Sequence, residues 1–219
     1  MLPIDDLFSD ADRRAIADAA RMAEGATSGE IVPYVVGQCD DYPLAGWKAA
    51  VLGGLIGGGT GVAVHSLGGF WGGSVWLWVV LPLVVVGLLG PVVARISNPL
   101  KRWLIGDRLL ELRARQRAAS AFIDEEVFAT RDRTGILIFA ALFERRVVVL
   151  GDAGINRVVP DGAWQQIVDG VVRGVRQGRA TEALIQAIGD AGRLLEAHRL
   201  EIRPDDIDEL DNELRVSDR

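Results

Sequence analysis

The 219-residue sequence has one cysteine and two histidines, and these scarcities exclude several kinds of site. Because Cys39 is the only cysteine, no disulfide within the chain is possible, and we interpret it as a small residue at a strand end. His65 and His198 lie in different predicted elements, so a histidine pair is not expected. The formal net charge of −6 argues against nucleic acid as a partner, since phosphate binding favours a basic surface.

Several catalytic signatures are also missing. A cysteine-based phosphatase needs an arginine at the end of its thiolate loop, and residues 39–45 contain none. The Asp-x-Asp spacing of an aspartate-based phosphatase is notable only at Asp206 and Asp208, in the acidic tail. Neither a P-loop nor a dinucleotide-binding glycine motif follows a predicted strand. The sequence therefore contains no assembled catalytic motif.

Charged residues are absent from two long segments, residues 49–67 and 74–94. Each is long enough to cross about 30 Å of hydrocarbon as a helix, and two such runs in succession disfavour buried core helices. The glycine-rich link at residues 65–73 is so short that the two helices must be antiparallel. Tryptophans lie at or near the helix ends, where aromatic residues anchor membrane proteins: Trp47, Trp71, Trp76 and Trp78. We therefore predict a transmembrane helical hairpin within residues 46–97.

Gly53, Gly57 and Gly61 recur at four-residue spacing in the first of these helices. Such a row of small residues allows two helix backbones to approach closely. Its partner is either the second helix of the same hairpin or another copy of the chain. Neither helix contains an ionisable acid or a lysine or arginine, which transport pathways usually need. The hairpin is therefore predicted to be an anchor.

Basic residues flank the hairpin but are missing from its turn. They are Lys48 before the first helix and Arg95, Lys101, Arg102 and Arg108 after the second. The positive-inside rule places both termini in the cytoplasm, and the expected location is the inner (cytoplasmic) membrane. The basic residues after the hairpin either contact anionic lipid headgroups or form the solvated face of a domain helix. Membrane lipid is thus one expected partner, with Lys101, Arg102 and Arg108 at the membrane surface.

The segments on either side of the hairpin have the pattern of a soluble α/β domain. We predict helices at about 9–25, 99–122, 161–176 and 180–199, and strands at 30–36, 135–143 and 146–151. Ile207, Leu210 and Leu214 indicate a short helix in the tail. Pro33 suggests an edge or bulged position for the first strand. The strand at 135–143 is apolar on both faces, so it should be central.

Neither segment can bury its apolar residues alone. The simplest architecture is therefore a three-layer α/β domain with a small mixed sheet of three or four strands, interrupted by the two-helix transmembrane hairpin. Residues 1–45 and 98–200 are predicted to form its two parts, with the hairpin at 46–97 and an acidic tail at 201–219.

Four motifs resemble the TPM domain family: Thr27-Ser-Gly-Glu-Ile-Val32, Arg133-Thr-Gly-Ile-Leu-Ile138, Glu144-Arg-Arg-Val-Val-Val-Leu-Gly-Asp152 and Trp164-Gln-Gln-Ile-Val168. The resemblance covers most of residues 7–198 apart from the hairpin. It implies a membrane-tethered domain with a small α/β sheet. Some members of the family are acid phosphatases, and others are assembly or repair factors for membrane complexes. Related domains bind a divalent cation through carboxylates near the strand ends.

The chain departs from the family in one stretch that bears on cation binding. Common members carry Asp-Asn-Gly before the central strand, where this sequence has Arg133, Thr134 and Gly135. The insertion of a hairpin within the domain also differs from members with a single tail anchor. Both departures weaken the expectation of cation binding and phosphatase activity.

Carboxylates at the predicted strand ends are the remaining candidates for chemistry. If they converge, Glu30, Asp132 and Asp152 could hold a divalent cation such as Ca²⁺ or Mg²⁺; otherwise they are turn and cap residues. Glu144, Arg145 and Arg146 are candidates for contact with a partner or a phosphate group, and the arginines could equally pair with neighbouring carboxylates.

The predicted function is that of a membrane-anchored TPM-like domain without catalysis. It would act as a binding, assembly or quality-control factor for a membrane protein partner or for its own oligomer. The alternative is a cation-dependent acid phosphatase that uses the strand-end carboxylates.

Overall fold

The computed structural model describes residues 7–68, 74–198 and 209–218. These residues divide into two compact units, one formed by residues 1–40 and 111–219 and the other by residues 41–110. The first unit is therefore built from the chain on both sides of the second. Trp71 in the predicted hairpin turn and Ile207 in the predicted tail helix lie outside the described residues.

The first unit contains helices and strands in mixed order. They are α1 (Asp10–Glu24), β1 (Glu30–Val36), most of α5 (Asp107–Asp124), β2 (Gly135–Ala141), β3 (Arg146–Gly151), α6 (Ala153–Val158), the 3-10 helix η2 (Asp161–Trp164), α7 (Gln165–Arg176), α8 (Ala180–Ala197) and β4 (Arg215–Ser217). A capping box begins α1: Ser9 accepts a hydrogen bond from the Asp12 N–H, and the Asp12 carboxylate accepts one from the Ser9 N–H. The Ser9 hydroxyl also donates to the Asp12 carboxylate at 2.6 Å, and this hydrogen bond, together with the one from the Ser9 N–H, holds the pKa of Asp12 below its usual value.

The four strands form one mixed sheet in the order β3-β2-β1-β4. Strand β1 is parallel to β2 and to β4, whereas β2 and β3 are antiparallel and form the predicted β-hairpin. The predicted α/β fold with a small mixed sheet is confirmed. As the sequence indicated, β2 is central, and all seven of its residues are buried.

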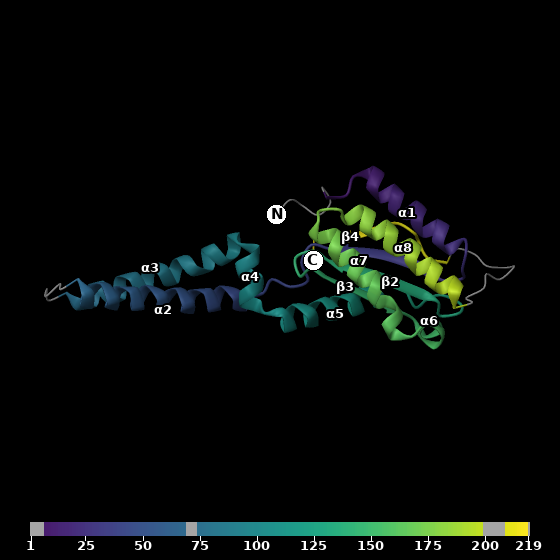
Figure 1. The fold of residues 1–219 in the computed structure, drawn as a ribbon. Helices are drawn as coiled ribbons and strands as arrows, with labels where there is room; N and C mark the ends of the chain where they lie inside the picture. The colour runs from purple at the N-terminus through teal and green to yellow at the C-terminus, as the bar shows by residue number, and fades with distance from the viewer. Residues whose placement is uncertain (1–6, 69–73, 199–208, 219) are drawn as a thin grey trace. The chain divides into compact units, whose positions relative to one another are not determined.

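Helices cover both faces of this sheet (Figure 1). Alternate residues of β1 contribute to different clusters: Ile31 and Val35 pack with residues of α1, α7 and α8, and Val32 and Val36 pack with the alanine face of α5. This alternation follows from the two-residue period of a strand. The domain therefore has the three layers that the sequence predicted.

The prediction of a helix in the tail is wrong at its C-terminal end, where the structure has the strand β4. Leu214 is buried against the sheet, and the three residues from Arg215 onward pair in parallel with Tyr34–Val36 of β1. The short β4 also explains why Pro33 is tolerated in an internal strand. Because β4 pairs only beyond Pro33, the missing N–H of this proline does not interrupt that ladder.

The second unit contains α2 (Pro43–Leu67), α3 (Val75–Ile96) and α4 (Asn98–Ile105). Helices α2 and α3 are long and apolar enough to cross a membrane. Their apolar side chains are largely exposed: Leu55, Ile56 and Leu88 each keep about two thirds or more of their surface accessible, at 67%, 65% and 71%. Full exposure of so many apolar groups in water is unfavourable, which is consistent with membrane association.

The predicted single helix at 99–122 is wrong, because the structure has two helices there. Helix α4 ends at Ile105, and Gly106 has a φ of +85° before α5 begins. This conformation is accessible to glycine and strained for other residues, so the glycine allows the chain to change direction. Trp103 is 72% exposed on α4, whereas Leu104 is buried.

Candidate functional site

Three of the four predicted carboxylates lie at one end of the sheet. Glu30 is the first residue of β1, Asp132 lies just before β2, and Asp152 follows β3. Strand β1 is parallel to β2, and the Asp152 N–H donates to the carbonyl of Gly135 at the start of β2. The fourth carboxylate, Glu144, lies in the β2–β3 turn and therefore at the opposite end of the sheet.

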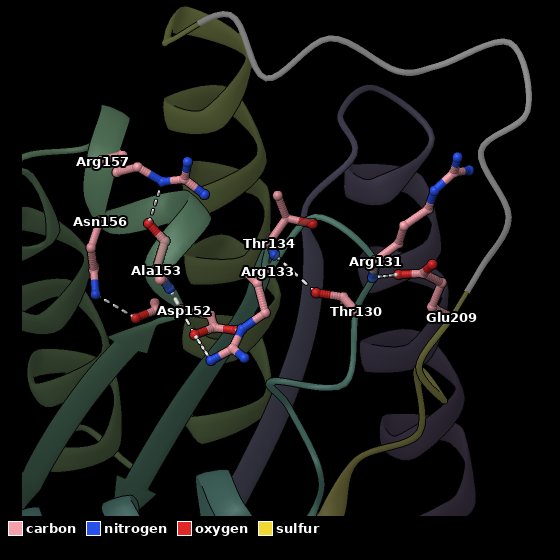
Figure 2. A network of polar contacts seen from close by, with 10 residues as sticks. Thr130, Arg131, Arg133, Thr134, Asp152, Ala153, Asn156, Arg157 and Glu209 are labelled. Carbon is pink, nitrogen blue, oxygen red and sulfur yellow. Dashed lines mark hydrogen bonds and ion pairs between the residues drawn. The ribbon is translucent and has the colours of Figure 1, made fainter.

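Asp152 has both carboxylate oxygens engaged by the protein (Figure 2). Its Oδ1 accepts from the N–H of Ala153 at 2.7 Å, which makes Asp152 the N-cap of α6. The Arg133 guanidinium binds the same carboxylate through two nitrogens, with Nη2 at 3.0 Å from Oδ1 and Nε hydrogen-bonded to Oδ2. The Asp152 side chain is only 6% exposed, so this pair shields it from solvent.

Arg133 is held in place by its own backbone and by its neighbours. Its φ of +60° is in the left-handed region, and its N–H donates to the carbonyl of Thr130 at 3.1 Å. The guanidinium carbon lies 5.8 Å from the centre of the Phe128 ring, a cation–π distance. The Asp152 carboxylate raises the pKa of Arg133, so the arginine stays charged.

The loop that carries Arg133 packs closely against the first turn of α6. The Gly154 N–H donates to the Arg133 carbonyl at 2.8 Å. A side chain at Gly154 would lie 2.4 Å from the Asp132 carbonyl and 2.5 Å from that of Arg133, so only glycine fits without a shift. The Thr134 N–H donates to the hydroxyl of Thr130, which closes the loop (Figure 2).

Glu30 and Glu209 tie this end of the sheet to the C-terminal segment. The Glu30 carboxylate accepts from the N–H of Glu209 at 3.4 Å. The Glu209 carboxylate in turn accepts from the N–H of Arg131 at 2.9 Å (Figure 2). The two carboxylates thus join β1, the loop before β2 and the segment that leads into β4.

This arrangement does not fit a divalent cation. A cation would need the Asp152 oxygens that Arg133 and the α6 N–H already use, and it would approach a guanidinium of the same charge. Across the described residues, no three histidine, cysteine or carboxylate side chains gather closely enough to hold a metal ion. Glu30, Asp132 and Asp152 share an end of the sheet without forming a ligand set.

The opposite end of the sheet holds Glu144 and Cys39. Glu144 is 2% exposed, and its Oε1 accepts from the Cys39 N–H at 2.9 Å. Burial raises the pKa of the Cys39 thiol, and the nearby Glu144 charge raises it further. Arg145 occupies a left-handed turn position with φ +54°. Arg146 points elsewhere, with its Nε 3.3 Å from the Glu111 carboxylate on α5.

The glycines of α2 face α3. A side chain at Gly53, Gly57 or Gly61 would lie 2.6, 2.3 or 1.9 Å from a backbone carbonyl of α3. The carbonyls belong to Val86, Pro82 and Trp78, respectively. The second helix of the same hairpin is therefore the neighbour of these glycines in the structure.

The basic residues after the hairpin do not share one environment. The Lys101 ammonium lies 5.8 Å from the centre of the Tyr42 ring, within the second unit. Arg102 lies on α4, and Arg108 lies beyond Gly106 on α5. Lys48, which was predicted to precede the first helix, lies within α2 because that helix already begins at Pro43. Its ammonium group donates to the Leu104 carbonyl near the C-terminus of α4 at 2.7 Å.

The pairing of Arg133 with Asp152 was missed by sequence reasoning, although a signal for it exists. Counting outward from the turn of a β-hairpin brings the last residues before β2 close to the first residues after β3. The arginine was noted only as a departure from a carboxylate motif. In the structure, Arg133 binds the two Asp152 oxygens that a cation would need as ligands.

Comparisons with known proteins agree with this fold. The TPM domain family model matches residues 107–194, from the start of α5 into α8. Among solved structures, the chain is similar to the NMR structure of the BA42 protein from the psychrophilic bacterium Bizionia argentinensis, with a TM-score of 0.59 and 21% identity over 99% of each chain. At this identity the likeness shows the fold alone. No curated protein matches the chain.

The matched residues include three of the four motifs on which the resemblance rested, and the motif at 27–32 lies outside them. This match contains β2, β3 and the helices that follow them, so the predicted resemblance to the TPM domain family is confirmed over residues 107–194.

Proposed function

We propose that this protein is a membrane-anchored TPM domain that binds a membrane protein partner or its own oligomer and does not catalyse a reaction. One observation carries the proposal: Arg133 and the α6 N-terminus use both oxygens of Asp152, the strand-end carboxylate that follows β3. The two apolar helices support the anchor. The membrane is proposed to be the bacterial inner membrane, with both termini in the cytoplasm.

A phosphatase assay distinguishes this role from the alternative of a cation-dependent acid phosphatase. The full chain in mild detergent is incubated with p-nitrophenyl phosphate at acidic and neutral pH, with Mg²⁺, with Ca²⁺ or with a chelator. We expect no metal-dependent hydrolysis. Metal-dependent activity that disappears in Asp152→Asn, but persists in the matched α8 variant Asp190→Asn, would overturn the non-catalytic role.

Purification in mild detergent tests the binding role. The full chain, solubilised from membranes, is expected to elute with a membrane protein partner or as an oligomer. Mass measurement by light scattering and identification of co-eluting proteins check this expectation. Elution as a lone monomer at every detergent concentration would contradict it.

A further inference from the structure

We propose that the open edge of β3 binds an extended acidic peptide segment of a partner protein, which joins the sheet as an additional strand. This inference rests on the proposed binding role and names the class of partner. It depends on the geometry of the edge, on the groove that flanks it and on the charge of that groove.

Strand β3 lies at one end of the sheet order, so one side of its backbone faces away from β2. The Asp152 N–H donates to Gly135 of β2, and hydrogen-bonded positions alternate along an antiparallel pair. The backbone groups of Val148 and Leu150 therefore face β2, and those of Val147 and Val149 face outward. Within the described chain, no hydrogen bond to these outward groups occurs.

The open stretch has a defined length. Next along the strand, the carbonyl of Gly151 accepts from the Asn156 side chain at 2.6 Å, which closes that end. Val147 to Leu150 carry no charge, and charged side chains inside an edge strand are a common protection against pairing. The uncharged edge is thus available for strand addition, a recognised mode of peptide binding.

A groove of about 750 Å³ runs along this edge. Strand β3 lines the groove together with residues 111–115 of α5 and one face of α7. Val168 and Val172 of α7 lie on one side and Ala114 of α5 on the other. Because strand side chains alternate between the two faces of a sheet, an added strand would place successive residues against α7 and α5.

The groove is basic although the chain is acidic. Five arginines line it: Arg115, Arg145, Arg146, Arg173 and Arg176. Only two carboxylates oppose them, Glu111 and Asp169, which leaves a formal excess of three positive charges in a chain of net charge −6. Glu111 is itself engaged by Arg115 at 2.9 Å and by Arg146 at 3.3 Å.

The charge decides between occupants of the groove. A second copy that paired β3 with β3 would bring two arginine-lined grooves together, and like charges in close contact oppose association. An acidic segment meets complementary charge on both sides of the edge. Its backbone pairs with Val147 and Val149, and its acidic side chains reach the arginines at the rim.

A fluorescein-labelled octapeptide with alternating glutamate and valine tests the proposal by fluorescence anisotropy with the full chain in mild detergent. We expect saturable binding, and no binding of the matched peptide with lysine in place of glutamate. Two further peptides are N-methylated at every glutamate or at every valine. Since an added strand uses only alternate N–H groups for the β3 edge, one N-methylated peptide should bind and the other should not.

Protein variants test the same contacts from the other side. Val149→Pro removes the outward N–H without removing a bond to β2, and we expect a loss of affinity of about tenfold. Val149→Ala, which keeps the N–H, is its control. The double variant Arg173→Glu/Arg176→Glu should lose at least about tenfold. Its matched control is Arg21→Glu/Arg193→Glu, which changes two exposed arginines on α1 and α8 by the same charge.

Several outcomes would overturn the proposal. Equal binding of both N-methylated peptides by the wild-type chain would show charge attraction without strand addition, even if Val149→Pro failed to fold. Absence of peptide binding would reject the acidic strand as the occupant. Competition by phosphatidylglycerol vesicles without peptide selectivity would assign the groove to lipid, and dimerisation abolished by Val149→Pro would assign it to a second copy. None of these results alters co-elution with a membrane partner, so failure here is distinguishable from failure of the proposed function.

Discussion

At Asp152, one side chain serves two structural roles. It caps α6 through the Ala153 N–H and binds the Arg133 guanidinium through both oxygens. Because the Arg133 side chain is 53% exposed, solvent screens the ion pair, and its contribution to stability is small. The cap and the buried position of the carboxylate therefore dominate the effect of mutating Asp152.

We predict that Asp152→Ala destabilises the domain by about 1–2 kcal/mol, because the α6 N-terminus loses its cap and Arg133 loses its partner. Asp152→Asn keeps a side-chain oxygen for the cap, so its loss should be smaller. Thermal unfolding of the full chain in detergent, followed by circular dichroism, measures both. Equal destabilisation by the two variants would contradict a capping role.

The Cys39 thiol offers a test of electrostatics at the other end of the sheet. Burial and the neighbouring Glu144 charge both raise its pKa, so little thiolate is present at pH 8. Glu144→Gln removes the charge and keeps a side-chain oxygen for the Cys39 N–H. We therefore predict a lower thiol pKa and severalfold faster alkylation by iodoacetamide at pH 8, since each pKa unit changes the thiolate fraction by about tenfold.

Alkylation of Cys39 followed over a range of pH by mass spectrometry checks this direction. Asp190→Asn on α8, which removes a carboxylate outside the Cys39 environment, should leave the rate unchanged. An unaltered rate in Glu144→Gln would show that the buried charge does not act on the thiol.

At the scale of elements, the α2–α3 hairpin depends on the absence of side chains at specific positions. A Cβ at Gly61 would lie 1.9 Å from the Trp78 carbonyl, whereas at Gly59 nothing lies within 4 Å. The two glycines lie two residues apart in α2, and only Gly61 contacts α3. Close backbone approach is the feature that small residues permit in membrane helices.

We predict that Gly61→Ala weakens the hairpin by about 1–3 kcal/mol, because the added methyl group must push α3 away. Gly59→Ala should change stability by less than about 0.5 kcal/mol. Unfolding of the full chain in mixed micelles with increasing sodium dodecyl sulfate compares them. Equal sensitivity of both variants would argue that the glycines contact something other than α3.

At the scale of the whole molecule, the hairpin unit is inserted into a domain that needs the chain on both sides of it. Strand β1 comes before the insertion, and its neighbours β2 and β4 come after it. Residues 41–110 form their own compact unit between them. The domain sheet can therefore form only after the hairpin has been synthesised.

Cysteine labelling tests the proposed topology. In a Cys39→Ser background, Ser66→Cys near the end of α2 should react with a membrane-impermeant maleimide in intact cells, and Ser120→Cys on α5 should react only after lysis. Both serines are exposed, so burial does not limit the reaction. The basis is the distribution of lysine and arginine around the hairpin. Labelling of Ser120→Cys in intact cells would reverse the proposed orientation.

Features carried by neighbouring residues were predictable from the sequence. The two uncharged segments determined the membrane-length helices, because a span depends on length and on the absence of charge. Ser9 and Asp12 identified the start of α1, and the apolar character of residues 135–143 placed β2 at the centre of the sheet. These are local signals, so no tertiary contact was needed to recognise them.

Only the tertiary structure decided the features that join distant residues. Strand β4 pairs with β1 across the whole chain, and a pattern of leucines in the tail cannot distinguish that pairing from a helix. Similarly, the sequence shows only that Arg133 stands where related domains have a carboxylate. Its contact with Asp152 depends on the register between β2 and β3. Thus the sequence by itself indicated most of the helices and strands and the resemblance to the TPM domain family. The pairing of Arg133 with Asp152, and the position of β3 at the edge of the sheet, both depend on which strand lies beside which. That order is set by packing across the domain.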